Sequence, residues 1–340
     1  MDSSRVQRIV NGFASRRVLV IGDLMLDEFV WGKVSRISPE APVPVVTVTA
    51  DSYYPGGAAN VARNVREFTP GTAVMGLAGT DAAGTRLVGL LEQAGIDTSA
   101  VECTGGFPTT VKTRIIARNQ QVVRVDRERK VELTPEQIAR AVERLERALP
   151  QVDAAIVADY GKGFLSQELA DHICRTARAH GKILSVDPHP STSLVWRNAT
   201  VIKPNRAEAF SAVGVAPSET AEPPDGDTAL LEAAARLQAV WSPENLLITL
   251  GEQGMLLFER GAPPAHIPAR AKDVFDVSGA GDTALAVLTL ALASGATVAE
   301  AAELANHASG IAVGKLGTAT VTAGELLAGF EQPAQRTASL

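Results

Sequence analysis

The sequence predicts an α/β fold in which a doubly wound, mostly parallel β-sheet carries a small inserted β lid. Three observations lead to this prediction. Short apolar runs that end in a glycine, an aspartate or another polar residue recur along the chain, as buried parallel strands do. Segments with helical periodicity lie between these runs. Two segments rich in β-branched residues lack an intervening helix.

The first predicted strand covers residues 17–23, where an apolar run ends at Gly22 and Asp23. A buried parallel strand of this kind delivers its last polar residue into the crevice where doubly wound folds bind ligands. Later runs follow the same pattern and end at Asp81, Asp159, Asp187, Lys203 or Gly251. These runs are residues 74–77, 154–157, 183–186, 201–202 and 246–250.

A helix is predicted after Thr134, which is a suitable N-cap followed by a proline at the first helical position. The apolar side chains recur there at a spacing of 3.6 residues, at Ile138, Val142, Leu145 and Leu149.

Residues 43–49 and 109–126 are rich in β-branched residues and partly alternate, which predicts antiparallel strands. We expect them to form the lid, from about residues 30–50 and 107–127. An exposed sheet has edges to protect, often by pairing with a second copy, so a homodimer through the lid is expected. The proline-rich residues 216–227 indicate a surface loop.

The length of 340 residues suits two domains, or one large α/β domain with an appendage. Hydrophobic residues make up 46% and charged residues 21%, which is typical of a packed globular protein. Aromatic residues make up only 4%, so Ala, Val and Leu must build the core. We expect the main domain at residues 17–330, after an N-terminal extension (1–16) and before a C-terminal tail (331–340).

The formal net charge of −6 gives the protein no general affinity for polyanions, so no nucleic-acid partner is expected. Cys103 and Cys174 have neither disulfide nor zinc spacing, which indicates a reduced cytoplasm. Residues 1–17 lack the apolar core of a signal peptide. The uncharged residues 283–298 are too few to cross a bilayer core of ~30 Å, so we predict a buried helix and no membrane partner.

The strongest chemical motif covers residues 276–283, where glycines precede an apolar helical run. Backbone N–H groups at such a helix start converge on an anion, and the helix dipole adds favourable charge. Asp282 lies at the same point. One interpretation makes it only an N-terminal cap. If a transferring phosphoryl group occupies the glycine turn, Asp282 is instead placed to accept a proton from an attacking hydroxyl.

A second glycine turn, at Gly56 and Gly57, runs into a helix that carries Asn60. Taken alone, it indicates no more than a turn followed by a helix whose Val61, Val65 and Phe68 face the core. Together the two motifs resemble the two signatures of the ribokinase-like (PfkB) carbohydrate kinase family, in the same order and at a similar separation. The resemblance covers roughly residues 18–327 and implies a three-layer ribokinase-like sheet.

Further segments resemble one branch of this family, the heptose 7-phosphate kinases: residues 22–27, 35–45, 118–121, 158–163 and 314–318. The resemblance implies an ATP-dependent transferase that phosphorylates O1 of D-glycero-β-D-manno-heptose 7-phosphate to the 1,7-bisphosphate, on the route to ADP-heptose for lipopolysaccharide cores. Some members carry a fused cytidylyltransferase-like domain with a His-x-Gly-His motif. This chain lacks that motif and resembles the stand-alone form.

Two alternatives stay open: another PfkB-type sugar or sugar-phosphate kinase, and a non-catalytic sugar-phosphate sensor on the same fold. A sensor would be free to lose the base, and Asp282 is present. A dinucleotide-dependent oxidoreductase needs a Gly-x-Gly-x-x-Gly turn after the first strand. The residues after Gly22 do not provide it.

Carried over residue by residue, the resemblance makes Asp282 the catalytic base. It implies ATP as co-substrate and Mg²⁺, with a monovalent cation as a further candidate, and Glu208 organising Mg²⁺ through water. The implied anion hole is Gly279, Ala280 and Gly281. The implied contacts with sugar hydroxyls are Asp27, Gly56, Gly57 and Asn60. The implied ATP contacts are Asn205, Arg206, Ala207, Glu208, Thr249, Gly251, Gly254 and Asn306.

The lid segment is strongly basic, and Lys112, Arg114, Arg118 and Arg124 share one parity, so an unbulged strand or hairpin presents several of them on one face. A phosphate on the sugar substrate is therefore expected to meet the lid. The candidate substrate-binding residues on this side are Arg118, Asn119, Arg124 and Lys162. Many relatives have Asp-Pro-Lys where this chain has Asp187, Pro188 and His189. In this chain the cationic contact made by that lysine is therefore missing, is made by a neutral histidine, or is supplied by Lys162 or Lys203. Asp187 itself can also be a cap at a strand end with no role in binding.

Overall fold

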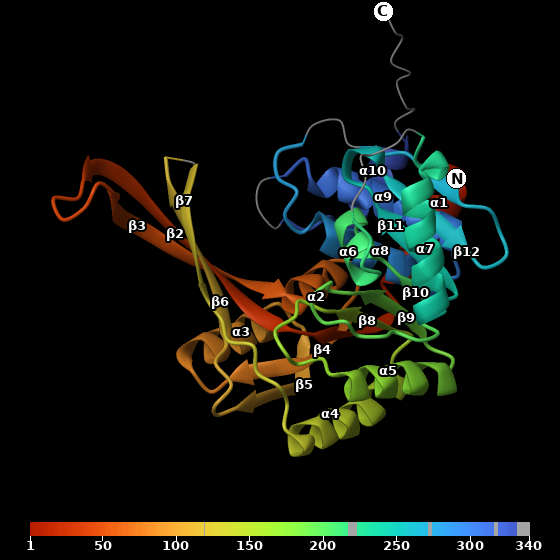
Figure 1. Cartoon of the computed structure of the whole chain (residues 1–340), viewed down its shortest axis with the longest axis horizontal. Helices are drawn as coiled ribbons and strands as arrows, with labels where there is room; N and C mark the ends of the chain where they lie inside the picture. Colours follow the sequence, from red (N-terminus) through yellow and green to blue (C-terminus); the bar gives the residue numbers. More distant parts are fainter. Residues whose placement is uncertain (119, 217–222, 271–273, 316–318, 332–340) are drawn as a thin grey trace, which may run out of the picture.

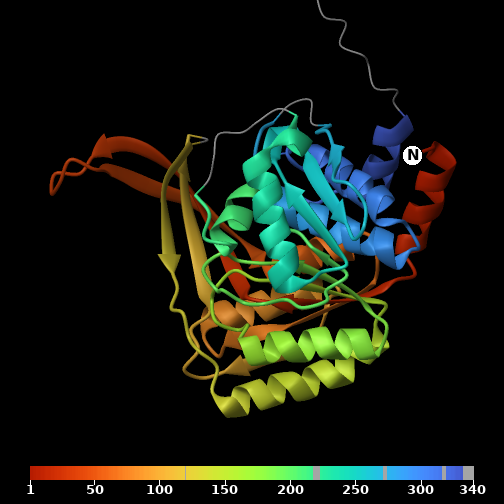
Figure 2. The same ribbon diagram turned by 45° about the vertical axis from the view of Figure 1, so that its right-hand side comes forward.

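The computed structural model of the chain describes residues 1–118, 120–216, 223–270, 274–315 and 319–331. It has a main body in which helices cover both faces of a large sheet, and a β lid that projects from this body (Figure 1). The turned view shows the same three layers and the same projecting lid (Figure 2). The predicted α/β fold, with a mostly parallel sheet in three layers and an inserted lid, is confirmed.

The central sheet has nine strands in the order β13-β12-β11-β10-β9-β8-β1-β4-β5. The seven strands from β11 to β5 at one end of this order pair in parallel with their neighbours. Strands β12 and β13 add an antiparallel edge at the other end. The chain winds outward in both directions from β1, which makes the carboxyl end of β1 a topological switch point. The strands are β1 (Arg17–Gly22), β4 (Gly71–Gly79), β5 (Asp97–Thr104), β8 (Ala154–Ala158), β9 (Ile183–Asp187), β10 (Val201–Ile202), β11 (Asn245–Thr249), β12 (Met255–Glu259) and β13 (Ala265–Ile267).

Two hydrophobic clusters fill the spaces on either side of this sheet. Val18 and Val20 of β1 belong to one cluster, and Leu19 and Ile21 to the other, because successive strand residues point to opposite faces. The first cluster includes side chains from α1 (Ser3–Phe13), α2 (Ala58–Arg66), α3 (Ala82–Gln93), α8 (Ala280–Ala293), α9 (Val298–Ala312) and α10 (Ala323–Glu331). The second includes side chains from α4 (Pro135–Ala148), α5 (Gln167–Ala179), α6 (Arg206–Ala212) and α7 (Thr228–Trp241).

The lid is a four-stranded sheet in the order β3-β2-β6-β7. The prediction of antiparallel strands is correct for the two hairpins but wrong at their junction, where β2 and β6 pair in parallel. Parallel pairing needs a long crossover, and the chain supplies one by passing through α2, β4, α3 and β5 between the two strands. The lid strands are β2 (Leu24–Ile37), β3 (Pro44–Gly57), β6 (Thr110–Ala117) and β7 (Gln120–Arg127).

The residues before β1 are an integral part of the main body. Helix α1 buries Val6, Ile9, Val10 and Phe13 in the same cluster as α8 and α9, because its apolar side chains recur at helical spacing. The N-terminal extension expected at residues 1–16 therefore contributes to the core. Most of the expected tail lies outside the described residues. Of the expected surface loop at 216–227 the structure describes residues 216 and 223–227, and it buries Pro224 and Asp227.

The helix predicted after Thr134 is α4, where Thr134 and Gln137 form a reciprocal capping box. The uncharged residues 283–298 enter the core mainly as α8, which ends at Ala293 before α9 begins. Within the described residues, no helix is both long enough and apolar enough for a membrane span.

Candidate active site

A cavity of about 410 Å³ lies at the carboxyl ends of the central strands. This is the edge where the sequence predicted that polar residues would gather, beside the switch point at β1. The lining residues come from the ends of β8, β9, β10 and β11 and the start of α8: Asp159, Tyr160, Asp187, Pro188, His189, Lys203, Asn205, Glu208, Thr249, Gly251, Val277, Gly281 and Asp282.

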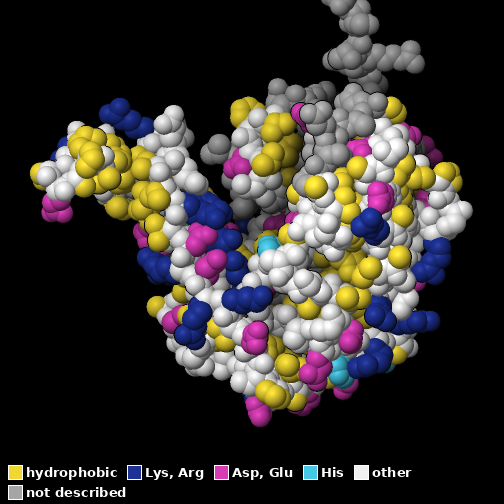
Figure 3. Space-filling model, viewed as in Figure 1, with side chains coloured by type: hydrophobic (Ala, Val, Ile, Leu, Met, Phe, Trp, Pro, Cys, Tyr) yellow, Lys and Arg dark blue, Asp and Glu magenta, His cyan; other side chains and the backbone are white. Residues whose placement is uncertain are grey.

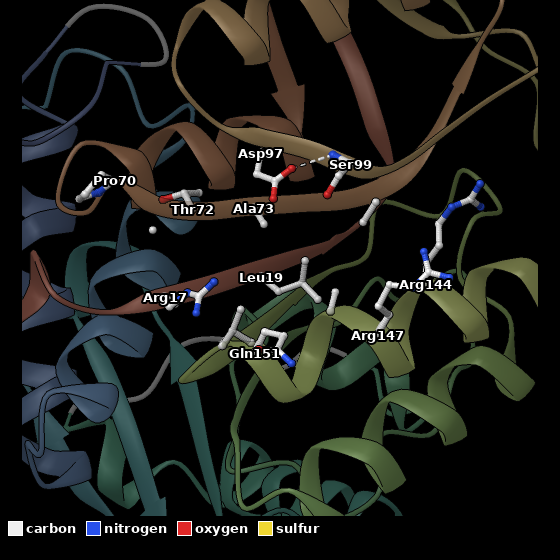
Figure 4. A pocket seen from close by; sticks show the side chains of 14 residues that line it. Arg17, Leu19, Pro70, Thr72, Ala73, Asp97, Ser99, Arg144, Arg147 and Gln151 are labelled. Carbon is white, nitrogen blue, oxygen red and sulfur yellow. Dashed lines mark hydrogen bonds between the residues drawn. The ribbon is translucent and has the colours of Figure 1, made fainter.

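A second cavity, of about 510 Å³, lies at the amino-terminal ends of the strands, opposite the first cavity (Figure 4). Its walls include the amino-terminal ends of β1, β4 and β5, and Arg17, Asp97 and Arg147 lie among its side chains. It contains no glycine turn that opens a helix. The carboxyl-end cavity is therefore the candidate active site.

Asp282 lies in the first turn of α8. The N-cap is Gly279, whose φ of 80° is a left-handed conformation that glycine adopts without strain. Asp282 is not the cap, because its carboxylate oxygens accept hydrogen bonds from elsewhere: from the Tyr160 hydroxyl at 2.7 Å and from the Asn60 side-chain amide at 2.6 Å. Burial raises the pKa of Asp282 to about 6, although these two hydrogen bonds lower it.

Asn60 and Arg63 lie one turn apart on α2, and Asn60 holds the carboxylate of Asp282 from one side. The Arg63 guanidinium donates to Asn60 Oδ1 at 3.3 Å, and Asn60 Nδ2 donates to Asp282. Because Arg63 offers only donors, its contact fixes which end of the Asn60 amide faces the carboxylate. Asn60 was expected to contact sugar hydroxyls, and the structure places its amide on the base.

Lys203 supplies a buried positive charge at the floor of the cavity. Its ammonium lies 3.0 Å from the carboxylate of Asp187, and its side chain is only 3% exposed. Burial alone would lower the pKa of Lys203, but the charge of Asp187 raises it, so the ammonium stays charged. A Cβ atom on Gly281 would lie 3.8 Å from this ammonium, so the glycine turn and the charge face the same space.

Helix α6 begins at the same cavity. Asn205 is its N-cap and forms a capping box with Glu208, whose carboxylate accepts from the backbone N–H of Asn205 at 2.8 Å. Burial, and then the charge of Asp187, raise the pKa of Glu208. Arg206 instead pairs with Asp227 at 2.7 Å. Arg206 and Ala207 do not line the cavity.

The expected ATP loop is only partly at the cavity. Thr249 and Gly251 line it, whereas Gly254, with a φ of 90°, packs its backbone against Ile267 and Pro268. Asn306 is buried on α9 and donates to the carbonyl of Pro268 at 2.7 Å, so it does not line the cavity either.

Asp27 lies at the base of the lid on β2, and its carboxylate pairs with Arg114 at 2.5 Å. Gly56, on β3, leaves the space that this carboxylate needs: a Cβ atom there would lie 2.4 Å from Asp27 Oδ2. Gly57 has a φ of 58° and precedes α2. These residues join the lid to the helix that carries Asn60.

A network of backbone hydrogen bonds shapes the loop that follows β8. The buried carboxylate of Asp23 accepts from the backbone N–H groups of Tyr160, Lys162 and Phe164. Asp159 is also buried, and burial raises its pKa to about 6. The loop therefore has a fixed conformation, and it directs Tyr160 toward Asp282.

The basic residues that were expected to bind the sugar phosphate from the lid side lie at different places and do not form one cluster. Arg124 pairs with Asp126 on β7 at 2.9 Å and is half-exposed. Arg118 occupies the turn between β6 and β7 with a φ of 50°. Asn119 lies outside the described residues. Lys162 pairs with Glu128 at 2.7 Å, close to the cavity.

Sequence reasoning did not assign roles to Tyr160 and Asp23, and it left Asp187 and Lys203 open. The signal was nevertheless present, because each of these residues follows the apolar run of a predicted strand within a few positions. What was missing was which strand ends are neighbours. The sheet order brings β1, β8, β9 and β10 side by side.

A model of the pfkB family carbohydrate kinases matches residues 15–323. The bifunctional protein HldE of Desulfatibacillum aliphaticivorans is 45% identical over 94% of this chain, and that of Caulobacter vibrioides is 44% identical over 96%. The chain spans 64% and 66% of the lengths of these two relatives.

Two solved structures share the fold. Arabidopsis thaliana ribokinase complexed with ribose and ATP superimposes with a TM-score of 0.70 at 17% identity, covering 94% of this chain and 99% of that one. Phosphofructokinase-2 from Escherichia coli in complex with potassium gives a TM-score of 0.71 at 20% identity, covering 93% and 98%.

Proposed function

Because the chain belongs to the pfkB family of carbohydrate kinases, we propose that it transfers the γ-phosphoryl group of ATP to a sugar phosphate. The proposed acceptor is O1 of D-glycero-β-D-manno-heptose 7-phosphate, and the product is the 1,7-bisphosphate on the route to ADP-heptose. The heptose branch is supported by the segments that resemble it and by relatives called HldE. The kinase chemistry is supported by one observation above all: Asp282 stands in the first turn of α8, beside the glycine turn and the Lys203 ammonium.

In the proposed mechanism, Asp282 accepts the proton of the attacking hydroxyl. Tyr160 and Asn60 hold its carboxylate in place, so little reorganisation is needed when the hydroxyl arrives. The N–H groups of Ala280 and Gly281 at the start of α8 receive the negative charge of the transferring group. Lys203 stabilises the same charge from the floor of the cavity.

Mg²⁺ is the expected metal, and the carboxylates of the cavity suit it. Asp187 and Glu208 offer hard oxygen donors. Burial, and then the charge of Asp187, raise the pKa of Glu208, so a nearby cation would favour its ionised form. Within the described residues no cluster of three metal-ligating side chains occurs. When bound, Mg²⁺ neutralises developing phosphate charge. A monovalent cation is a further candidate, supported by the potassium named for phosphofructokinase-2.

We predict that replacing Glu208 by glutamine raises the Mg²⁺ concentration needed for half-maximal rate, with a smaller change in the KM of the sugar. The variant keeps the size of the side chain and its contact with the backbone N–H of Asn205 but loses the charge. The measurement is a Mg²⁺ titration at saturating ATP and sugar. An unchanged Mg²⁺ dependence would remove Glu208 from this role.

We also predict that kcat/KM falls on the acid side of about pH 6, by up to tenfold per pH unit, because protonated Asp282 is no base. Asp159 has a similar pKa, so the wild-type profile alone does not identify the group. Tyr160→Phe removes a hydrogen bond that lowers the pKa of Asp282, and the inflection should therefore move to higher pH. An inflection that stays where it was would contradict the assignment.

The test of the function is ATP consumption with heptose 7-phosphate, fructose 6-phosphate and ribose. The highest kcat/KM is expected with heptose 7-phosphate. Preference for another acceptor would replace the proposed substrate by another sugar of the same family. A sensor would bind sugar phosphate without turnover of any acceptor.

The proposed assembly is a homodimer through the lid. Val48, Val123 and Val125 of the lid strands are 58%, 45% and 42% exposed, and the edge strands β3 and β7 have free edges within the described residues. A second copy would cover this apolar surface and pair the edges. Sedimentation velocity at micromolar concentration should give twice the mass of one chain, and a monomer would contradict the proposal.

A further inference from the structure

A group of two lysines and one histidine lies on the lid side of the cavity, away from the proposed ATP contacts. Lys112 is on lid strand β6, Lys162 is in the loop after β8, and His189 follows β9 and lines the cavity. Lysine and arginine side chains gather where the lid meets the main body (Figure 3). Thr249, Asn205 and Glu208 line the cavity at the ends of β10 and β11, so the lid side is left for the sugar.

Lys112 is half-buried, and its side-chain ammonium makes no hydrogen bond or ion pair to any described residue, although its backbone pairs with β2 and β7. The pairing of the strands explains why. Asp27 and Asp126 are its neighbours on β2 and β7, but Arg114 holds the carboxylate of Asp27 and Arg124 holds that of Asp126. Burial, and then the nearby charge of Lys162, lower the pKa of Lys112. An ammonium left unpaired at such a place is stabilised by an added anion.

His189 offers a third donor beside these lysines. Its Nδ1 lies 2.8 Å from the Ser191 hydroxyl and accepts from the backbone N–H of Ser191 at 3.3 Å. In the tautomer that fits both contacts, the Ser191 hydroxyl donates to Nδ1 and the ring proton is on Nε2. Burial, and then the charge of Lys162, lower the pKa of His189, so the ring is neutral and donates one hydrogen bond. A Cβ atom on Gly161 would lie 3.1 Å from Nδ1, so the ring packs against the loop that carries Lys162.

We propose that Lys112, Lys162 and the Nε2–H group of His189 form the receptor for the phosphate that the sugar substrate already carries. This inference rests on the proposed function, because it requires a phosphorylated acceptor. A phosphate dianion offers several acceptor oxygens to these donors. Lys162 already pairs with Glu128, so the charge that the phosphate compensates is that of Lys112. Lys112 also lies directly across from Asp27, so one sugar can reach both the lid carboxylate and the receptor. In this proposal the phosphate contacts these three residues and not Arg118, which is in the turn after β6, or Arg124, which pairs with Asp126.

The test compares kcat/KM for heptose 7-phosphate with that for unphosphorylated heptose. Lys112→Gln should lower the value for the phosphorylated sugar about 10- to 100-fold and leave the value for unphosphorylated heptose within about twofold, because one charge-assisted contact is lost. Lys112→Arg should recover most of the loss. Lys33→Gln is the matched control, because Lys33 is an exposed lid lysine without an ion pair among the described residues, and it should change neither value. The KM for ATP should stay the same in all three variants.

The outcomes separate this inference from the proposed function. If wild type prefers heptose 7-phosphate and Lys112→Gln keeps the full preference, the receptor is wrong and the function stands. A third outcome is that wild type has a higher kcat/KM with fructose 6-phosphate than with heptose 7-phosphate, and that Lys112→Gln reduces its preference for fructose 6-phosphate over fructose. This outcome would support the receptor and show that the heptose substrate is wrong. Equal losses on phosphorylated and unphosphorylated sugar would indicate a structural role for Lys112 and overturn the receptor. If wild type prefers no sugar phosphate over its unphosphorylated form, both proposals fail.

Discussion

Replacing Asp282 by asparagine is expected to lower kcat by a factor of about 10² to 10⁴, the range for loss of a general base. The variant keeps the shape of the side chain but has no group that can accept a proton at neutral pH. ATP and sugar binding should persist, because the glycine turn and Lys203 are unchanged. The measurement is single-turnover kinetics with binding constants determined in parallel.

The same substitution has a built-in control for folding. The pKa of Asp282 is raised in the folded protein, so the folded state binds the proton more tightly than the unfolded state does. The stability that Asp282 contributes is therefore present below its unfolded pKa and is lost as pH rises through about 6. At neutral pH the asparagine variant avoids this cost of a buried charge, and its thermal midpoint should not fall below that of wild type. Retention of a tenth or more of the wild-type kcat would remove Asp282 from the role of base.

Most of the main sheet was predictable, because β1, β4, β8, β9, β10 and β11 are largely buried and read as apolar runs. The antiparallel edge strands β12 and β13 were not predicted. Strands β2 and β5 were less visible. The outer end of β2 is exposed in the lid, and β5 mixes exposed polar residues with Ala100 and Glu102. The parallel pairing of β2 with β6 depends on a crossover through the main body, which local alternation does not record.

Some residues of the candidate site could likewise be predicted from the sequence, and others could not. Asp282 was predictable because glycines, a carboxylate and an apolar helix are consecutive in the chain. Tyr160 lies more than a hundred residues from Asp282, and the packing of α8 against β8 and β9 brings the two side chains together. The alternation of side chains along a strand correctly predicted that Lys112, Arg114 and Arg124 lie on the same face of the lid. It did not show that the two arginines are paired with carboxylates while Lys112 is not.

Lys203 is the residue for which we expect the largest combined effect on stability and turnover. In Lys203→Met the partly buried carboxylate of Asp187 loses its partner while it still faces Glu208 and Asp282. Removing one partner of a buried pair typically costs about 3 kcal/mol or more. The midpoint of urea denaturation should fall accordingly. The turnover number should fall by about 10² or more, because a fixed charge at the transferring phosphoryl group is lost.

The double variant Lys203→Met with Asp187→Asn separates these two effects. It removes both charges together, so no isolated carboxylate is left and most of the lost stability should return. Turnover should stay low, because the transferring phosphoryl group still lacks a cation at the floor of the cavity. If the double variant recovers turnover along with stability, Lys203 serves only to neutralise Asp187, and the stabilisation of phosphoryl charge must be assigned to the N–H groups at the start of α8 and the bound metal.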